Sequence, residues 1–294
     1  MLLPERGAFQ VLTTDAIVEG VHFDRRYSSL ADIGFKALAV NVSDIAAMAA
    51  KPEFGLLSLI LPDWITLEAL DELLDGLLEM AAAARVSVAG GNISRSPGPL
   101  IVDVTVTGSV RPRRILTRGG GKPGDGLYVT GSIGAAQAGL EALTRGSVPD
   151  SLAGCVRRHL RPDPRFRVGM LLGRNRAATA CMDLSDGLAD AVRQVAEASG
   201  VGATIDASLL PIDPAARAWF ESHGTDPVTA SMAGGDDFEL LFTVPKKRSG
   251  RLRAVKSAAR GVPFTRIGEL TASKELVIVR NGTAEPLPQG FQHF

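Results

Sequence analysis

The stretch "MDLSDGLAD", residues 182–190, joins an apolar run to an amphipathic segment and carries Asp183, Asp186 and Asp190. The apolar residues before Asp183 predict a buried strand, and the residues from Asp186 onward predict a helix. A strand that leads directly into a helix is typical of mixed α/β folds. An ionised carboxylate at such a junction costs several kcal/mol unless it is paired, hydrogen-bonded or bound to a cation. We therefore ask what these acids hold.

The same alternation of elements extends through the chain in both directions. At 294 residues the chain is long for one hydrophobic core, which favours two domains. The segment 111–124, "RPRRILTRGGGKPG", is rich in Arg, Gly and Pro and indicates an exposed connection. We expect an α/β (α+β) chain with domains at residues 1–112 and 113–294. The expected strands are 9–15, 54–62, 85–91, 100–110, 126–130, 178–185, 201–207 and 237–245; the expected helices are 31–50, 67–84 capped by Thr66, 214–224, and those starting at Ser132 and Asp186.

Composition excludes several classes of function. Lys and Arg together number 32, as do Asp and Glu, so no net charge attracts nucleic acid or an anionic membrane over long range. The two cysteines stand outside any metal-binding spacing. No apolar run reaches the roughly 18 residues that a membrane span needs, and the start of the chain does not resemble a signal peptide. We expect a cytoplasmic protein that binds neither nucleic acid nor membrane.

Four acids stand where the local pattern favours apolar or small residues: Asp15 at a strand end, Asp44 inside an alanine-rich helix, and Asp183 and Asp186 at the junction. Asp186 is open to a second interpretation as a helix N-cap, and Asp15 to one as a turn residue. Asp44 has no such alternative, because acids are poorly suited to the interior of a buried helix. Together the four favour a magnesium site that also holds phosphate, since Mg²⁺ uses few carboxylates and completes its shell with water and phosphate oxygens.

Three glycine-rich turns, at 88–96, 129–140 and 232–242, offer main-chain amides that can cradle a phosphate, although each can equally be a plain turn. The sequence lacks the GxxxxGK[ST] and GxGxxG patterns, which argues against a P-loop protein and an ordinary Rossmann domain. His22 is the only histidine in a motif-like stretch, and a lone histidine is more often a core or surface residue than a catalyst.

Seven stretches carry a resemblance to a known family. "LTTDAIVEGVHF", "NVSDIAAMAAKP", "AGGNISRS", "GGGKPGDGLYVTGSIGAAQAGL", "MDLSDGL", "GGDDFELLF" and "GFQHF" follow the order and approximate spacing of thiamine-monophosphate kinases. That family belongs to the superfamily of aminoimidazole ribonucleotide synthetase and selenophosphate synthetase. The resemblance implies two mixed α/β domains of the aminoimidazole ribonucleotide synthetase type and a homodimer formed through the N-terminal domains.

The resemblance also implies an activity: transfer of the ATP γ-phosphate to thiamine phosphate, with several Mg²⁺ ions and with K⁺ as a candidate further ion. The motifs assign three catalytic residues, Asp44, Arg118 and Asp186. The other implied roles are nucleotide binding by Gly91, Asn92, Arg118 and Ser185, acceptor binding by His22, Asp236 and Phe291, and metal binding by Thr14, Asp15, Asp44, Asn92, Asp183 and Asp186.

The given sequence starts just after the place of a Gly-Asp-Asp segment that supplies metal ligands in relatives, so either translation begins further upstream or the chain lacks part of its site. Asn92 stands where many relatives have aspartate. Two alternatives therefore remain beside the kinase: a catalytically impaired nucleotide-binding dimer, and a related ATPase that acts on another small acceptor.

Overall fold

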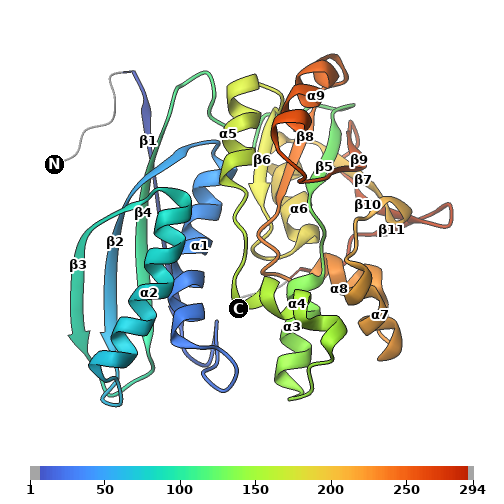
Figure 1. The fold of residues 1–294 in the computed structure, drawn as a ribbon. Coiled ribbons are helices and arrows are strands. Elements are labelled where there is room, and N and C mark those ends of the chain that lie inside the picture. The colour runs from blue at the N-terminus through green and yellow to red at the C-terminus, as the bar shows by residue number, and fades with distance from the viewer. Residues whose placement is uncertain (1–6, 291–294) are drawn as a thin grey trace.

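A computed structural model describes residues 7–290, so Phe291 lies outside the described residues. Figure 1 shows two sheets side by side, with helices filling the space between them. The predicted class, two mixed α/β domains, is confirmed. The chain passes from the last strand of the first sheet, which ends at Val110, to the second sheet at Gly126. A domain boundary after residue 112 stays a prediction.

The N-terminal sheet has four strands in the order β1-β4-β2-β3, in which β4 pairs antiparallel with β1 and β2, and β3 runs parallel to β2. Two helices cover one face, and within residues 7–290 no helix covers the other (Figure 1). Val102, Val104 and Val106 alternate inward along β4 and form the core beneath the helices. The elements are β1 (Phe9–Val18), α1 (Leu30–Ala47), β2 (Lys51–Leu61), α2 (Leu67–Ala84), β3 (Ser87–Arg95) and β4 (Ile101–Val110).

Helices α1 and α2 begin where their caps dictate. The Ser29 side chain accepts a hydrogen bond from Asp32 N, and the predicted cap Thr66 accepts one from Ala69 N. The two helices pack closely at glycines: a Cβ built on Gly34 would lie 1.9 Å from Leu73 O, and one on Gly76 would lie 1.8 Å from Ala31 O. This contact fixes α1, which carries Asp44, against the sheet.

The C-terminal sheet has seven strands in the order β11-β10-β7-β9-β5-β8-β6. All neighbouring strands are antiparallel except β7 and β10, which run parallel. Its strands are β5 (Gly126–Thr130), β6 (Ala180–Asp183), β7 (Gly202–Asp206), β8 (Leu240–Val244), β9 (Phe264–Thr271), β10 (Leu276–Arg280) and β11 (Thr283–Pro286). Its α-helices are α3 (Ala135–Thr144), α4 (Ala153–Leu160), α5 (Phe166–Asn175), α6 (Leu188–Ser199), α7 (Pro214–Ser222), α8 (Pro227–Ala233) and α9 (Ser249–Ala258).

Two expected helix starts and one strand start were too early. The helix expected from Ser132 begins at Ala135, because Gly134 at φ 82° forms its N-cap. The helix expected from Asp186 begins at Leu188 with Gly187 as N-cap and no side-chain capping bond, so the N-cap interpretation of Asp186 is wrong. The strand expected from Asp237 begins at Leu240. Asp15 closes no turn either, because β1 continues to Val18.

The charged, proline-containing stretch 157–166 joins two helices that the sequence analysis did not predict: α4 ends at Leu160 and α5 begins at Phe166. Helix α5 packs against α1 at Gly169, where a Cβ would lie 2.1 Å from Ala46 O. Ala46 joins Leu116, Val168 and Leu172 in one hydrophobic cluster across the two halves. The end of α1 that carries Asp44 is therefore part of the seam between the sheets. Among the helices of residues 7–290, none is both long and apolar enough to cross a bilayer.

Candidate functional site

Four predicted acids meet at the seam, although they come from three separate segments of the chain. Asp15 lies on β1, Asp44 in the last turn of α1, and Asp183 and Asp186 at the end of β6. Asp44 and Asp186 both act electrostatically on Asp15, and Asp44 does so on Asp183. The structure therefore brings together Asp15, Asp44, Asp183 and Asp186, which we call the acid cluster.

Two hydroxyl groups hold carboxylates of the acid cluster in place. Thr13 Oγ1 donates to Asp44 Oδ2, and Ser43 Oγ donates to Asp183 Oδ2 at 2.7 Å. Thr13 reaches the cluster because residues two apart on a strand share one face, as Thr13 and Asp15 do. The hydrogen bond from Ser43 to Asp183 links α1 directly to the end of β6. It therefore joins the two halves of the chain at the acid cluster itself.

Two acids of the cluster, Asp15 and Asp183, have raised pKa values. Burial, followed by the charge of Asp44 and a hydrogen bond to it, raises the pKa of Asp15 to about 6. Burial and the charge of Asp44 raise the pKa of Asp183 to about 7, although the Ser43 hydrogen bond acts in the opposite direction. Both shifts mean that the protein gathers negative charge without neutralising it.

The cluster suits a divalent cation that is bound together with phosphate. Within residues 7–290, no Lys or Arg forms an ion pair with Asp15, Asp44 or Asp183. The same residues contain no group of three or more His, Cys, Asp or Glu side chains already arranged as a metal cage. Mg²⁺ needs no such cage, because it keeps water and takes phosphate oxygens beside one or two carboxylates. The residues present therefore fit Mg²⁺ bound with a nucleotide.

Thr14 points away from the acid cluster. Its hydroxyl is 3.2 Å from Asp103 Oδ1 and 3.0 Å from Thr105 Oγ1, both on the neighbouring strand β4. Side chains alternate along a strand, so Thr14 lies on the opposite face of the sheet from Thr13 and Asp15. The Thr14 side chain therefore does not join the acid cluster.

Gly91 and Asn92 lie on β3, at the far edge of the sheet from β1. In the register of the sheet, Asn92 pairs with Ser58 of β2, Ser58 pairs with Asp103 of β4, and Asp103 pairs with Ala16 of β1. Three strand spacings of about 4.8 Å therefore separate Asn92 from β1. Every residue of β3 is exposed. One chain does not bring Gly91 and Asn92 to the acid cluster.

Ser185 follows β6 along the chain, and Arg118 lies on a loop beside this strand. Ser185 belongs to the junction itself, between Asp183 and Asp186. Arg118 is exposed on a loop next to the start of β6, where Cys181 N donates to Thr117 O at 2.9 Å. Arg118 therefore follows a residue that is hydrogen-bonded to Cys181, two positions before Asp183 on β6.

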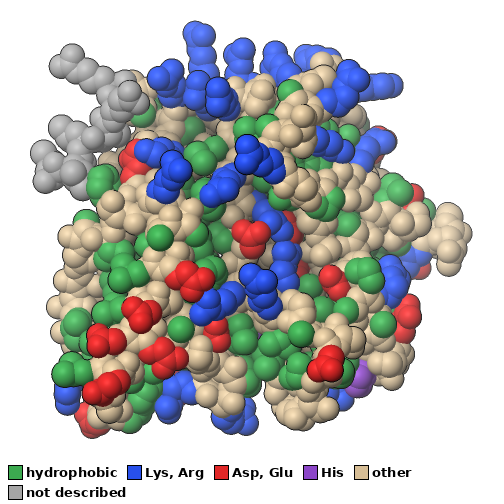
Figure 2. All heavy atoms as spheres, viewed as in Figure 1, with side chains coloured by type: hydrophobic (Ala, Val, Ile, Leu, Met, Phe, Trp, Pro, Cys, Tyr) green, Lys and Arg blue, Asp and Glu red, His purple; other side chains and the backbone are tan. Residues whose placement is uncertain are grey.

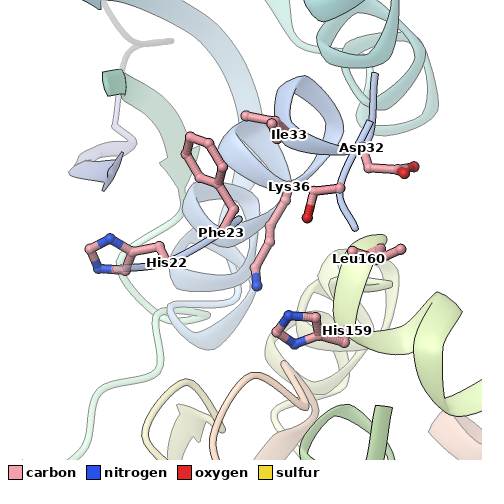
Figure 3. Close-up of a pocket in the computed structure, with 8 residues that line it drawn as sticks. His22, Phe23, Asp32, Ile33, Lys36, His159 and Leu160 are labelled. Atoms are coloured by element: carbon pink, nitrogen blue, oxygen red, sulfur yellow. The ribbon is translucent and has the colours of Figure 1, made fainter. Parts of the chain in front are cut away.

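A second group of predicted residues comes together from the two halves of the chain. His22 and Asp236 belong to opposite halves of the chain, and His22 is among the groups that lower the pKa of Asp236. Lys36 Nζ donates to Asp236 Oδ2 at 2.8 Å, and His159 Nδ1 lies 3.6 Å from the same oxygen. Figure 3 shows His22 and His159 on either side of the Lys36 amine. The last described residue, Gly290, packs against Asp186 and Asp190.

One glycine-rich turn does not offer its amides to a phosphate. At the start of α3, Gly134 N and Ala136 N donate to the buried Asp237 carboxylate at 2.7 and 3.2 Å. The helix N-terminus does bind an anion, as the turn 129–140 suggested, but that anion belongs to the chain. The turn at 232–242 supplies this internal ligand, and the anion-cradle interpretation of 129–140 is wrong.

Sequence reasoning missed four residues of these two groups: Thr13, Lys36, Ser43 and His159. Thr13 could have been predicted from the sequence, because it precedes Asp15 by two positions on a predicted strand and so shares its face. Lys36 carried a weaker signal, as a charge inside a helix expected to be buried. Ser43 and His159 carried no local signal, since their partners lie more than 70 residues away.

Comparison with known proteins defines the class first. The N-terminal domain of AIR synthase related proteins matches residues 2–110, and the C-terminal domain of the same proteins matches residues 122–281. The chain therefore has the two-domain architecture of AIR synthase related proteins. A solved hydrogenase maturation protein HypE in complex with ATP, only 19% identical, shares this fold with a TM-score of 0.81.

More similar relatives define the family. The thiamine-monophosphate kinase of Escherichia coli K12 is 39% identical over 99% of this chain and 88% of its own length, and that of Rhodopirellula baltica is 36% identical over 97% and 83%. The crystal structure of the Stenotrophomonas maltophilia enzyme matches with a TM-score of 0.88 at 32% identity, covering 97% of this chain and 89% of that one. The chain belongs to the thiamine-monophosphate kinase family.

A further solved structure contains ligands. "AaThiL complexed with AMPPCP and TMP" matches with a TM-score of 0.88 and 31% identity, covering 99% of this chain and 89% of that one. At this similarity the two chains share both domains and the seam between them.

Proposed function

We propose that this chain transfers the γ-phosphate of ATP directly to the phosphate of thiamine phosphate, which yields thiamine diphosphate and ADP. The observation that carries the proposal is the acid cluster, in which four carboxylates converge and, within residues 7–290, Asp15, Asp44 and Asp183 form no ion pair with Lys or Arg. The names of the family's members and the AMPPCP and TMP of the AaThiL structure support the choice of substrates.

The acceptor explains why the site is built from acids. A phosphate monoester is already ionised near neutral pH, so no general base is needed to create the nucleophile. The obstacle is repulsion between two polyanions that must approach in line. Bound Mg²⁺ supplies positive charge that neutralises and orients the phosphates. The residues that would hold it are Asp15, Asp44, Asp183 and Asp186, with the Thr14 main chain.

Other residues would orient the two substrates. Arg118 is exposed near β6 and can place a guanidinium against the transferring phosphate. Ser185, between two metal-binding acids, can donate to the nucleotide. His22 and Asp236 would face thiamine phosphate, and Phe291, the residue after Gly290, would stack on its rings. We assign the catalytic roles to Asp44, Arg118 and Asp186, and K⁺ to a further oxygen-rich position in the same site.

A homodimer would complete the site. The uncovered face and edges of the N-terminal sheet expose Leu12 (65%), Leu56 (50%) and Ile93 (60%), apolar area that a second copy would bury. A two-fold axis through this sheet would place β3 of one copy near β1 of the other. Gly91 and Asn92 would then reach the partner's acid cluster, which they cannot reach within one chain.

The dimer has a direct test by complementation. Asp44→Asn and Asn92→Ala chains, each inactive alone, should regain activity when mixed and allowed to exchange subunits, since one of the two sites in each mixed dimer is then intact. A monomer in analytical ultracentrifugation, or a mixture that stays inactive after confirmed exchange, would contradict this arrangement.

The function itself is tested by product analysis. The purified chain is incubated with ATP, Mg²⁺ and thiamine phosphate, and thiamine diphosphate is separated by chromatography. We expect thiamine diphosphate and ADP in equal amounts, and no product with thiamine or another phosphate monoester as acceptor. Tight ATP binding without product would favour an impaired nucleotide-binding protein, and turnover of another acceptor would favour a different ATPase.

A further inference from the structure

Lys36 is a buried charge with a function to explain. Its side chain is 5% exposed on α1, and its Nζ forms an ion pair of 2.8 Å with Asp236 of the C-terminal half. Taking a lysine amine out of water is costly, and a buried ion pair seldom repays that cost as stability alone. A buried pair that crosses the seam next to the acid cluster therefore suggests a role in the site.

Asp236 is held in an unusual backbone conformation. Its φ is 66°, in the left-handed region that non-glycine residues seldom occupy, and strain of this kind gathers at functional sites. The main chain fixes it there: Asp236 N donates to Ser185 O at 2.7 Å, and a Cβ on Gly235 would lie 2.4 Å from the same oxygen. The loop that carries Asp236 is thus pressed onto the junction of the acid cluster.

The Asp236 carboxylate is only partly buried. Its side chain is 36% exposed, while Oδ2 faces the buried amine of Lys36. Lys36, then His159 and His22, hold the pKa of this carboxyl below its usual range although burial acts in the opposite direction. Asp236 is therefore ionised at neutral pH, with one oxygen fixed and the other side open.

His159 completes the inner wall. It is 3% exposed, its Nδ1 has no hydrogen-bond partner among the described residues, and it lies 3.6 Å from Asp236 Oδ2. Burial and the charge of Lys36 lower the pKa of His159 to about 4, so the ring is neutral. The small cavity between His22, Lys36 and His159, about 10 Å³, is the size of one water molecule and too small for a substrate ring. Lys36 and His159 thus act behind Asp236, and the substrate does not contact them.

We propose that Lys36 and His159 are positioning residues for acceptor recognition: they hold the ionised Asp236 carboxylate with Oδ2 inward, so that its other oxygen meets the cationic rings of the acceptor. The proposal rests on the proposed function and adds two residues to its acceptor site. Because Lys36 balances the charge of Asp236, the gain is a fixed hydrogen-bond direction and not a long-range attraction.

Kinetic measurements on Lys36→Met test the proposal, since methionine keeps the length of the side chain without its charge. We expect the KM for thiamine phosphate to rise about 10- to 100-fold, as for loss of a hydrogen bond to a charged group. The KM for ATP should stay within about twofold. Lys36→Arg should restore part of the affinity, and His159→Gln should give a smaller rise of the same kind.

Arg161→Met is the matched control. Arg161 also joins the two halves, through ion pairs of 2.5 Å with Asp32 and 2.7 Å with Glu79, but it does not contact Asp236. We expect this variant to lose stability and to keep its KM for thiamine phosphate. Equal rises in both variants would show that Lys36 is merely structural.

A double-mutant cycle with Asp236→Asn separates positioning from direct binding. If Lys36 acts through Asp236, Lys36→Met should add nothing in the Asp236→Asn background. Additive effects, or a KM for ATP that rises in step, would overturn the proposal.

Titration of the His159 ring by NMR gives a readout that does not need activity. The ring should stay neutral above pH 5 in the wild type, and in Lys36→Met its pKa should move up towards 6.5, because Lys36 no longer opposes protonation. An unchanged titration would contradict the geometry. Failure of the wild type to bind thiamine phosphate would instead count against the proposed function, so the two failures are distinguishable.

Discussion

Two acidic sites in the same molecule, the buried Glu239 and the acid cluster, differ in whether basic side chains of the chain balance their charge. Glu239 is 0% exposed, and its carboxylate receives bonds from Arg158, from both Arg165 Nε at 2.6 Å and Arg165 Nη2 at 2.5 Å, and from Thr130 at 2.6 Å. The acid cluster lies at the seam. Its carboxylates accept hydrogen bonds from the hydroxyls of Thr13 and Ser43 and lie close enough to act electrostatically on one another. Figure 2 shows Lys and Arg gathered at the upper end of the view, with others down the middle of this face.

The difference separates structural acids from functional ones. Glu239 has its countercharges within the chain, so it belongs to the fold. Asp15 and Asp183 have raised pKa values and no basic partner in the described residues, so a bound proton or a cation from outside the chain has to balance their charge. A buried acid is thus informative only once its partners are known.

The largest expected effect comes from Asp44→Asn, which removes a charge that binds metal and keeps the shape of the side chain. We expect turnover to fall by at least about a thousandfold, or about 4 kcal/mol in the barrier. The metal-free stability should be unchanged or higher, because repulsion within the acid cluster decreases. Steady-state kinetics and urea unfolding measure the two effects, and wild-type turnover would overturn the ligand assignment.

Glu239→Gln should show the opposite behaviour. It removes the buried charge that pairs with Arg158 and Arg165 and leaves Arg165 with only the exposed Asp163, so we expect the free energy of unfolding to fall by about 3 kcal/mol. Added Mg²⁺ should not reverse this loss. Urea unfolding with and without Mg²⁺ tests it, and a variant as stable as the wild type would remove the contrast between the two groups.

A smaller effect is expected from pH. Burial raises the pKa values of Asp183 and Asp237 to about 7, and that of Asp15 is about 6, so the folded chain binds protons that the unfolded chain releases. Without metal, the free energy of unfolding should therefore rise by about 1–2 kcal/mol as the pH falls from 8 to 6.5. Below 6.5 the buried neutral His159, with a pKa of about 4, acts in the opposite direction.

Urea unfolding in EDTA at several pH values measures this linkage. Asp183→Asn should flatten the curve, because one of the proton-binding groups is lost. Saturating Mg²⁺ and nucleotide should remove most of the gain at low pH, since a bound cation favours the ionised carboxylates. A stability that falls steadily from pH 8 to 6.5 would contradict the raised pKa values.

Local chemistry made much of the fold predictable. Thr66 caps α2 as its sequence indicates, and β4 alternates between buried and half-exposed residues as "LIVDVTVTGSV" predicts. Asp44 was recognisable because nothing local justifies an acid inside an alanine-rich helix. Helices α4 and α5 were missed, because their apolar stripe is narrow and arginines and prolines surround it.

Contacts between distant segments could not be predicted from the residues alone. The anion at the start of α3 is Asp237, about 100 residues away, and the partner of Lys36 is 200 residues away. The opposite faces of Thr13 and Thr14 follow from the register of β1, which pairing with β4 fixes. The metal and substrate roles of the candidate residues remain proposals that the experiments above test.

Anomalous diffraction from crystals grown with Mn²⁺ and a non-hydrolysable ATP analogue tests the central claim most directly. The account predicts manganese peaks within bonding distance of carboxylate oxygens of Asp15, Asp44, Asp183 and Asp186, next to the phosphates of the nucleotide. Manganese bound elsewhere, or a nucleotide bound while the acid cluster holds no metal, would contradict it.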